Sequence, residues 1–554
     1  MRLLFLFLLS VLRDARTYAA NPLVMNWSSQ AYGPDGPWQA VTIDIGSNRQ
    51  PVALYPGANW ATTILADSIC SNTTLSNTCY AARAGTYNQS ESTTAVALNR
   101  SSWETSYWNV QGGSIKSTVG DQVTVGPVVP NVSFTTIYQT YQTYPNGKAY
   151  PVPVGNLALG APYLKNVVSG LTLNMIAAWL YSSGRENSIP SYSYGMHIGS
   201  VNPAIPGSLV LGGYDKSRVL GEVSSQSVSL SSYSSGTWQI VLKDIGLDVA
   251  TGGSPPGFTS KKGLFMQSSG TVLPKSVTVD PTKPYLYLPE ATCDAITSSF
   301  PVSFNNDLGL YIWDTTRSTY ANLTSSATYI SFSFNKNGLN DETITVKVPL
   351  RLLTLTLQDP LVDKNVTYFP CFFSSDTPVL GRAFLQAAFV GVNWFEGNNS
   401  GTWFLGQAPG PGLPKADITA INVKDTTLAA SSNSWEQSWA GHWHPLADSH
   451  SDSSPGNSNS GLTTAAKAGI GIGVGVAGAI LIAAVVWIVI LRRRRRQAPA
   501  AAAPVEKRKP VFRGFAELAS SRNVDDRPRE LDTKVDVKPK EMMGSQEPPR
   551  YELE

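Results

Sequence analysis

Short stretches of alternating apolar and polar residues run from Trp38 to Gln407 and constrain the fold more than any other feature of the chain. Val41–Ile45 and Ser208–Leu211 are two examples. Successive side chains of a strand point to opposite faces, so this alternation indicates half-buried strands. Gly, Pro, Asn and Ser separate the stretches at short intervals, which predicts an antiparallel, all-β protein. The clearest helical stretch in this region is Leu288–Ser299.

The length of the chain limits the number of its domains, and its charge limits the partners that it can bind. At 554 residues, the chain is long enough for several average domains or for one large bilobal domain with appendages. Its formal net charge is +3, and only 15% of its residues are charged. No strongly basic surface is implied, so we expect no nucleic-acid partner.

The N-terminus has the pattern of a secretory signal. Arg2 opens a short basic region, and Leu3–Leu12 is almost wholly apolar. This apolar run is too short to span a bilayer. Thr17–Ala20 offers small residues for cleavage, and Arg13, Asp14 and Arg16 precede them. We therefore predict a signal peptide over residues 1–20. An uncleaved anchor is the alternative interpretation.

A second apolar run, Ala468–Leu491, predicts a transmembrane helix. At about 1.5 Å of rise per residue, this run is long enough to cross a hydrocarbon core of about 30 Å. Arg492–Arg496 follow it directly, and positive residues stay on the cytoplasmic side. The pattern predicts a single-pass type I protein of the plasma membrane, with an extracellular body and a basic cytoplasmic tail over residues 492–554.

Sequons and cysteines agree with this orientation. The four cysteines all precede the apolar run, where an oxidising environment favours disulfides, and four cysteines allow three pairings. None of the sequons for N-glycosylation lies in the tail. The cysteines are Cys70, Cys79, Cys293 and Cys371, and the sequons are at Asn26, Asn72, Asn88, Asn99, Asn131, Asn322, Asn365 and Asn398.

The composition changes after Pro409–Pro414. Residues 426–464 are rich in Ser, Asn, Ala and Gly and have almost no periodic apolar pattern. We therefore predict a flexible, Ser-rich extracellular stalk over residues 411–467. The Pro and charged residues of the tail predict disorder there as well.

The order of several motifs resembles that of the pepsin-like aspartic proteases. The resemblance implies a bilobal fold, with a short N-terminal extension over residues 21–37, an N-terminal lobe over 38–225 and a C-terminal lobe over 226–410. It also implies the disulfides Cys70–Cys79 and Cys293–Cys371. The motifs are Val41–Gly46, Gly120–Gly126, Leu157–Gly160, Pro206–Asp215 and Val379–Leu385. With Tyr32–Trp38, the stalk and the membrane helix, the chain is similar to membrane-anchored, catalytically degenerate members found in filamentous fungi.

In that family two aspartates, one from each lobe, share a proton around one water molecule, and each lies in an Asp-Thr/Ser-Gly loop. Neither form of this loop occurs in the chain. When Gly57 is aligned with the glycine of the first loop, Tyr55 takes the place of the aspartate. In the second loop Asp280 aligns with the aspartate, but Pro281 and Thr282 replace the hydroxyl residue and the glycine.

These replacements predict that the catalytic pair is lost. A tyrosine with a pKa near 10 does not act as a base at acidic or neutral pH. Asp280 is then an unpaired remnant, and one hypothesis is that the Tyr55 hydroxyl donates a hydrogen bond to it. Tyr107–Asn109 lie near the place of the family's flap tyrosine.

Other chemistries find less support. The chain has no Gly-x-Ser-x-Gly motif and no His-Glu-x-x-His motif, and we predict no metal and no cofactor. The sequence therefore predicts a membrane-anchored surface glycoprotein whose inter-lobe cleft binds or senses a peptide or cell-wall polymer. The alternative is a membrane-tethered acid endopeptidase, similar to the yapsin group, that works with an atypical site around Asp280.

Overall fold

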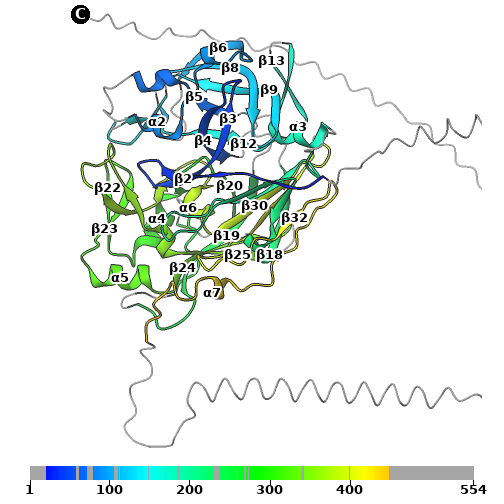
Figure 1. Cartoon of the computed structure of the whole chain (residues 1–554). Helices are drawn as coiled ribbons and strands as arrows, with labels where there is room; N and C mark the ends of the chain where they lie inside the picture. Colours follow the sequence, from blue (N-terminus) through cyan, green and yellow to red (C-terminus); the bar gives the residue numbers. More distant parts are fainter. Residues whose placement is uncertain are drawn as a thin grey trace, which may run out of the picture. The chain divides into compact units, whose positions relative to one another are not determined.

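The computed structural model describes residues 20–447, apart from short gaps, and strands from this range build two lobes (Figure 1). The predicted membrane helix, the tail and most of the predicted signal peptide lie outside the described residues. The gaps are residues 58–61, 72–78, 105–109, 112, 139, 148, 162, 169, 184–187, 229–237, 256–257, 259, 268–269, 272–273, 339–341 and 399.

The first lobe is built on a ten-stranded sheet, drawn from blue to cyan in Figure 1. Strand β3 shows why the sequence folds this way: along Trp38–Ile45, buried apolar residues alternate with half-exposed polar ones over most of its length. The strands, in sheet order, are β13 (Lys165–Val168), β14 (Leu171–Asn174), β9 (Val128–Ile137), β5 (Thr62–Leu65), β12 (Gly155–Ala158), β4 (Gln50–Gly57), β3, β8 (Gly113–Thr124) and β6 (Val96–Glu104), with β2 (Trp27–Tyr32) paired to β3. Near this sheet in sequence are α2 (Tyr80–Ala84), α3 (Ile176–Ser182) and the 3-10 helices η1 (Asp67–Ser71) and η2 (Gln89–Glu91), while β11 (Ala149–Pro151), β10 (Tyr141–Thr143) and β7 (Val110–Gln111) make a separate three-stranded sheet.

The second lobe contains a seven-stranded and a four-stranded sheet. The helix expected at Leu288–Ser299 is present as α4 (Glu290–Thr297). The larger sheet has the order β25 (Thr343–Pro349), β24 (Thr328–Asn335), β19 (Trp238–Val249), β20 (Lys275–Val279), β29 (Val379–Leu380), β21 (Leu286–Leu288) and β28 (Cys371–Phe373). The smaller sheet has the order β22 (Val302–Asn305), β23 (Leu310–Trp313), β27 (Val366–Phe369) and β26 (Leu355–Leu357), and the remaining helices of this part are α5 (Ser318–Ser325), η5 (Leu350–Leu353) and α6 (Arg382–Leu385).

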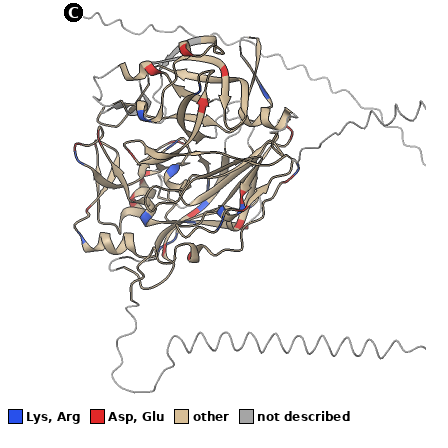
Figure 2. Ribbon diagram, in the orientation of Figure 1, with Lys and Arg blue, Asp and Glu red and all other residues tan. Residues whose placement is uncertain are grey.

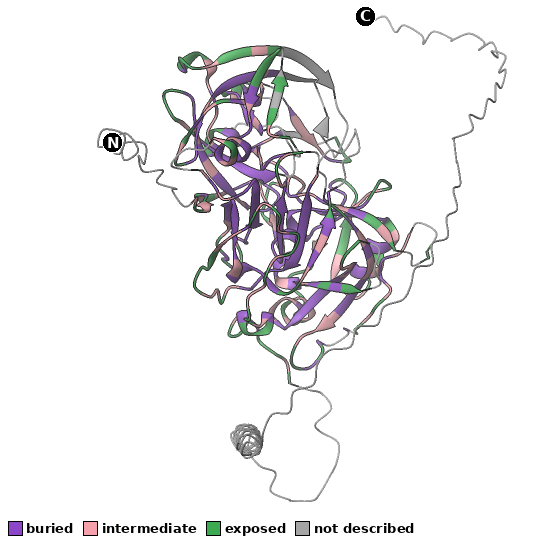
Figure 3. Ribbon diagram, turned by 90° about the vertical axis from the view of Figure 1, so that its right-hand side faces the viewer, coloured by how far each residue is buried: buried purple, intermediate pink, exposed green. Residues whose placement is uncertain are grey.

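A six-stranded sheet collects strands from the start, the middle and the end of the body. Trp403 on its strand β31 stacks on Trp238 of β19, with ring centroids 6.3 Å apart, so this sheet packs on the second lobe. Buried segments run through the middle of the body and exposed ones lie on its rim (Figure 3). The sheet order is β1 (Leu23–Val24), β16 (Ser208–Leu211), β15 (Ser193–His197), β30 (Ala388–Asn393), β31 (Thr402–Gln407) and β18 (Leu220–Ser227), so the predicted lobe boundary at 225/226 falls inside β18.

Two disulfides join the four cysteines. Cys70 pairs with Cys79 at the end of η1, and Cys293 of α4 pairs with Cys371 of β28. These are the pairings that the resemblance implies. The second disulfide closes a long loop and ties the helix to the sheet beneath it.

Most of the predicted glycosylation sites that the structure describes are accessible. Asn26, Asn99, Asn131, Asn365 and Asn398 are exposed, while Asn88 and Asn322 are half-buried. Asn72 lies outside the described residues. Glycosylation of these sites stays a prediction.

The predicted start of the stalk at residue 411 is wrong, because residues 411–447 pack onto the body. β32 (Ile418–Ala420) pairs with β17 (Gly213–Asp215), which is followed by the 3-10 helix η4 (Lys216–Arg218). Beyond them, Trp435 at the start of α7 (Trp435–Ser438), Trp439 and Trp443 are all buried. The indole of Trp443 packs against those of Trp435 and Trp439, with ring centroids 5.2 and 5.4 Å apart. These three tryptophans were not recognised from the sequence because the segment around them is rich in Ser.

Within the described residues, no helix has both the length and the apolarity that a membrane crossing requires.

We predict that Trp439 is needed for a stable body. Its indole is 1% exposed and stacks on Trp443, with ring centroids 5.4 Å apart. Trp439→Ala should lower the free energy of unfolding by about 3–5 kcal/mol, because the substitution opens a cavity. Chemical denaturation measures this change. Lys415→Ala, an exposed position of the same segment, is the control, and equal stabilities of the two variants would contradict the packing described here.

We also predict that acid destabilises the body through His197. Its Nε2 lies 2.9 Å from the Gln386 carbonyl oxygen, and its buried Nδ1 has no partner. Burial lowers the pKa of His197 to about 3, the charge of Arg218 adds to this shift, and the Gln386 carbonyl and Asp215 oppose it. Since the unfolded pKa is about 6.5, this stabilisation is complete above pH 6.5 and is lost as the pH falls towards 3.

The test compares wild type with His197→Gln. The amide of the variant can donate a hydrogen bond as the imidazole does, but it does not titrate. Between pH 7 and pH 4 the wild type should lose about 3 kcal/mol more free energy of unfolding than the variant. Parallel curves for the two proteins would show that His197 is not buried in its neutral form.

Candidate functional site

The C-terminal end of β4 and the loop that follows β20 face each other at the junction of the lobes. Each belongs to a strand with a parallel partner, β12 for β4 and β29 for β20, so both lobes present their loop in the same setting. A Cβ atom added to Gly57 would lie 2.9 Å from the Cγ2 atom of Thr282. The positions aligned with the two loop glycines of the family therefore meet, which places Tyr55 and Asp280 on the two sides of the junction.

Tyr55 is buried at the end of β4 with 5% of its surface exposed. Its hydroxyl group donates to the Tyr32 carbonyl oxygen at 3.1 Å. Because a hydroxyl has one proton, the hypothesised hydrogen bond from Tyr55 to Asp280 is wrong. Burial raises the pKa of Tyr55, the charge of Arg382 opposes this shift and that of Asp35 adds to it, so Tyr55 stays a neutral hydroxyl.

Asp280 is bound within its own loop. Its Oδ1 accepts hydrogen bonds from the Thr282 backbone N–H at 2.9 Å and from the Thr282 hydroxyl at 2.7 Å. Asp side chains commonly form such a local turn by accepting from the backbone two residues further along the chain. The half-buried carboxylate therefore shapes the second loop.

A cation, Arg382, lies over the first loop. It is the fourth residue of the Val379–Leu385 motif and begins α6. The centre of its guanidinium is 4.2 Å from the ring centroid of Tyr55 and 5.0 Å from that of Trp38. Its Nη1 donates to the carbonyl oxygens of Pro281 and Thr282, at 3.1 and 2.9 Å. Arg382 thus links the first loop to the second through cation–π contacts and hydrogen bonds.

A buried carboxylate comes from the N-terminal extension. Asp35 is 3% exposed and accepts from Trp38 Nε1 at 3.0 Å and from the Tyr285 hydroxyl at 3.4 Å. Burial raises the pKa of Asp35, and the charge of Arg382 and the hydrogen bond from Trp38 oppose this shift. Asp35 was not among the residues predicted from the sequence. The available signal was the Gly33–Pro37 turn pattern directly before a tryptophan.

The extension crosses from the first lobe to the second. Gln358 N–H donates to the Pro34 carbonyl oxygen at 2.8 Å, and Thr356 N–H donates to that of Gly36 at 3.3 Å. The Tyr368 hydroxyl donates to the Asp35 carbonyl oxygen. These contacts fix the loop that carries Asp35 against β26 and β27.

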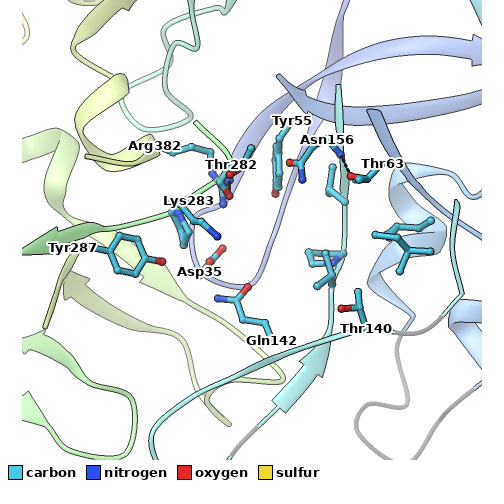
Figure 4. Close-up of a pocket in the computed structure, with 17 residues that line it drawn as sticks. Asp35, Tyr55, Thr63, Thr140, Gln142, Asn156, Thr282, Lys283, Tyr287 and Arg382 are labelled. Atoms are coloured by element: carbon cyan, nitrogen blue, oxygen red, sulfur yellow. Dashed lines mark hydrogen bonds between the residues drawn. The ribbon is translucent and has the colours of Figure 1, made fainter. Parts of the chain in front are cut away.

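A pocket of about 250 Å³ lies at this junction (Figure 4). Its charged lining residues are Asp35, Lys283 and Arg382, although charged residues are sparse on both lobes (Figure 2). Tyr107–Asn109, the predicted flap residues, lie outside the described residues. The rest of the lining is Tyr55, Thr63, Leu65, Ile137, Thr140, Gln142, Val152, Pro153, Val154, Gly155, Asn156, Thr282, Pro284 and Tyr287.

The charged groups in and beside the pocket act on one another. Loss of hydration inside it lowers the pKa of Lys283 to about 8, the charge of Asp280 opposes this shift and that of Arg382 adds to it. In the part of the chain that the structure describes, no group of three or more His, Cys, Asp or Glu side chains is arranged to hold a metal ion.

Comparison with known proteins gives one family. The sequence model of the family described as eukaryotic aspartyl protease matches residues 39–401. Among solved structures, the aspartic proteinase from Irpex lacteus matches with a TM-score of 0.44 and 14% identity, over 70% of this chain and 97% of that chain. A search of curated proteins returned no match.

We predict that Asp35 makes stability fall as the pH rises. Since its folded pKa is raised, its contribution is complete below the unfolded pKa of about 3.9 and is lost as the pH rises through the folded value. Relative to Asp35→Asn, the wild type should lose free energy of unfolding between pH 4 and pH 7. Denaturation at several pH values measures this difference. Asp363→Asn, at an exposed position, is the control, and the same pH slope in all three proteins would contradict the buried placement of Asp35.

Proposed function

The chain belongs to the eukaryotic aspartyl protease family, and from that membership we propose that it is a catalytically inactive member whose body binds or senses a ligand. The observation that carries the proposal is the Arg382 guanidinium, 4.2 Å from the ring of Tyr55, where the first carboxylate of the family would lie.

The chemistry of the family needs two carboxylates about 3 Å apart that share one proton. One then acts as a base towards water while the other donates to the peptide carbonyl. At this junction Tyr55 is a neutral hydroxyl, and the Asp280 carboxylate is bound by Thr282. A neighbouring guanidinium also favours ionised carboxylates, whereas the shared proton requires one neutral acid.

The alternative is an acid endopeptidase with an atypical site around Asp280. Asp35 is the second carboxylate that such a site would use, since it lines the junction pocket together with Thr282 of the Asp280 loop. Its hydrogen bonds go to Trp38 and Tyr285, and none joins it to Asp280 among the described residues.

The proposal includes the subcellular location of the protein. The apolar run at 468–491 followed by five arginines supports a single-pass anchor, with the body outside the plasma membrane and the tail in the cytoplasm. The exposed sequons and the two disulfides of the body are consistent with secretion. The body would then present its inter-lobe pocket to peptides or cell-wall polymers.

The test is hydrolysis of a mixed peptide library by the purified protein from pH 3 to pH 7, with Asp280→Asn and Asp35→Asn measured in parallel. We expect cleavage by the wild type to equal the background of both variants. Cleavage that either substitution abolishes would overturn the proposal and would assign catalysis to the substituted carboxylate.

A further inference from the structure

We infer that an N-glycan on Asn398 is part of the structure of the body: its first N-acetylglucosamine occupies a surface hollow beside Asn398 and stacks on the ring of Phe395. This inference goes beyond the proposed function and uses only its claim that the body passes through the secretory pathway. It is carried by the position of the hollow, by the free aromatic ring that lines it and by the strained backbone that presents this ring.

The hollow lies between two surface segments. One is the loop that joins β30 to β31, and the other is residues 423–426 of the segment that packs onto the body after the second lobe. The volume of about 330 Å³ is at the lower end of the roughly 300–1,000 Å³ of small-ligand pockets, so it suits about one sugar residue. The lining includes Phe395, Asn398, Ser400, Val423, Lys424 and Thr426.

Asn398 has an amide nitrogen that is free to carry a glycan. The residue is exposed, lines the hollow and forms a sequon with Ser400. The Ser400 hydroxyl donates to its Oδ1 at 2.8 Å, while its Nδ2 has no hydrogen-bond partner among the described residues. Asn88 differs, since its Nδ2 donates to Glu91 at 3.1 Å. The amide of Asn398 is therefore oriented through its oxygen and open at its nitrogen.

The attachment is a transfer from an oligosaccharide linked to a lipid diphosphate. The bond from C1 of the first sugar to the diphosphate oxygen breaks, a bond from C1 to Asn398 Nδ2 forms, and the amide nitrogen gives up one proton. The sugar is then joined directly to a residue that lines the hollow, so its effective concentration there is high.

Phe395 supplies the surface on which the sugar lies. Its side chain is half-exposed and lines the hollow, and its ring contacts no other aromatic ring among the described residues. One face of the sugar presents mainly C–H groups, whose partial positive charge is attracted to the negative face of an aromatic ring. Among the predicted sequons, Asn398 alone has an aromatic residue three positions before it. Lys424 and Thr426 line the same hollow and suit the hydroxyl and acetamide groups.

The backbone presents this ring at an energetic cost. Phe395 has a φ of 53°, in the left-handed region that bulky side chains rarely adopt. Gly397 N–H donates to the Trp394 carbonyl oxygen at 3.0 Å, which closes the turn. Phe395 N–H donates to Asn393 Oδ1 at 3.0 Å. Glycine would fit this backbone without strain, so a phenylalanine here indicates that its ring has a compensating contact.

A sugar in the hollow ties the hairpin loop to the segment that follows the second lobe. Asn393 already joins the two, because its Nδ2 donates to the carbonyl oxygens of Asn422 at 3.0 Å and of Asp425 at 2.9 Å. Both walls of the hollow are thus positioned before the sugar is attached. We expect the glycan to slow the local opening of residues 421–426.

The experiment is hydrogen exchange of the full-length glycoprotein, read by mass spectrometry on residues 421–426. An endoglycosidase first trims every glycan to its first N-acetylglucosamine, and an Asn398 peptide without this sugar would overturn the inference. Asn398→Gln should speed exchange of the segment by about threefold or more, as expected for the loss of one aromatic contact. Ser400→Ala, which keeps Asn398 but removes the sequon, should act in the same way. Asn365→Gln, at another exposed sequon, is the control and should change nothing.

Phe395→Gly tests the stacking itself, because glycine keeps the left-handed backbone and removes the ring. In the glycosylated protein it should speed exchange by a factor similar to that of Asn398→Gln. Combined with Asn398→Gln, it should add nothing further, since the two variants remove the same contact. Additive effects, or an unchanged rate in Asn398→Gln, would overturn the inference. Peptide cleavage is not part of this readout, so the proposed function stands or fails separately.

Discussion

The contact of the Arg382 guanidinium with the rings of Tyr55 and Trp38 is the interaction on which the lobe junction depends. Its Nη1 also holds the carbonyl oxygens of the second loop, so one side chain joins both loops and the N-terminal extension. Arginine suits this role because its planar, weakly hydrated cation stacks on aromatic rings and still donates in its own plane.

This arrangement changes the chemistry that the junction can perform. In a catalytic pair, two carboxylates repel each other and one keeps a proton. Here Tyr55 supplies a neutral phenol and Asp280 a carboxylate bound by its own loop, while the cation, Arg382, comes from α6. Asp35 restores a negative charge from a different segment, but its hydrogen bonds direct it towards Trp38 and Tyr285. These contacts support the proposal that the junction does not move a proton between two acids.

Much of the fold and half of the site could be predicted from the sequence. Alternation in β3 and in Ser208–Leu211 gave the strands, because strand periodicity is a local property. The absence of a carboxylate base in the first loop followed from the identity of Tyr55 alone. Arg382, in contrast, lay in a recognised motif but gave no local sign that its side chain turns towards Tyr55, since that contact joins residues far apart in the chain.

Two errors share this cause. Asp35 was not predicted because its burial depends on β26 and β27, more than 300 residues away. Trp435 and Trp439 lie in a Ser-rich segment whose average composition indicated a stalk, and only the surface of the second lobe gives them a place to pack. Composition describes a segment on its own, whereas burial depends on what the rest of the chain offers it.

The most direct measurement of the central claim is the affinity of the protein for a pepstatin-type inhibitor, a transition-state analogue of hydrolysis by two carboxylates. Such analogues bind a working site far more tightly than substrates do, because they use the interactions that form in the transition state. With Arg382 over the first loop, the account predicts no measurable binding at micromolar inhibitor between pH 4 and pH 7. Submicromolar binding that Asp280→Asn abolishes would contradict it and would show that a functional pair of acids forms at the junction.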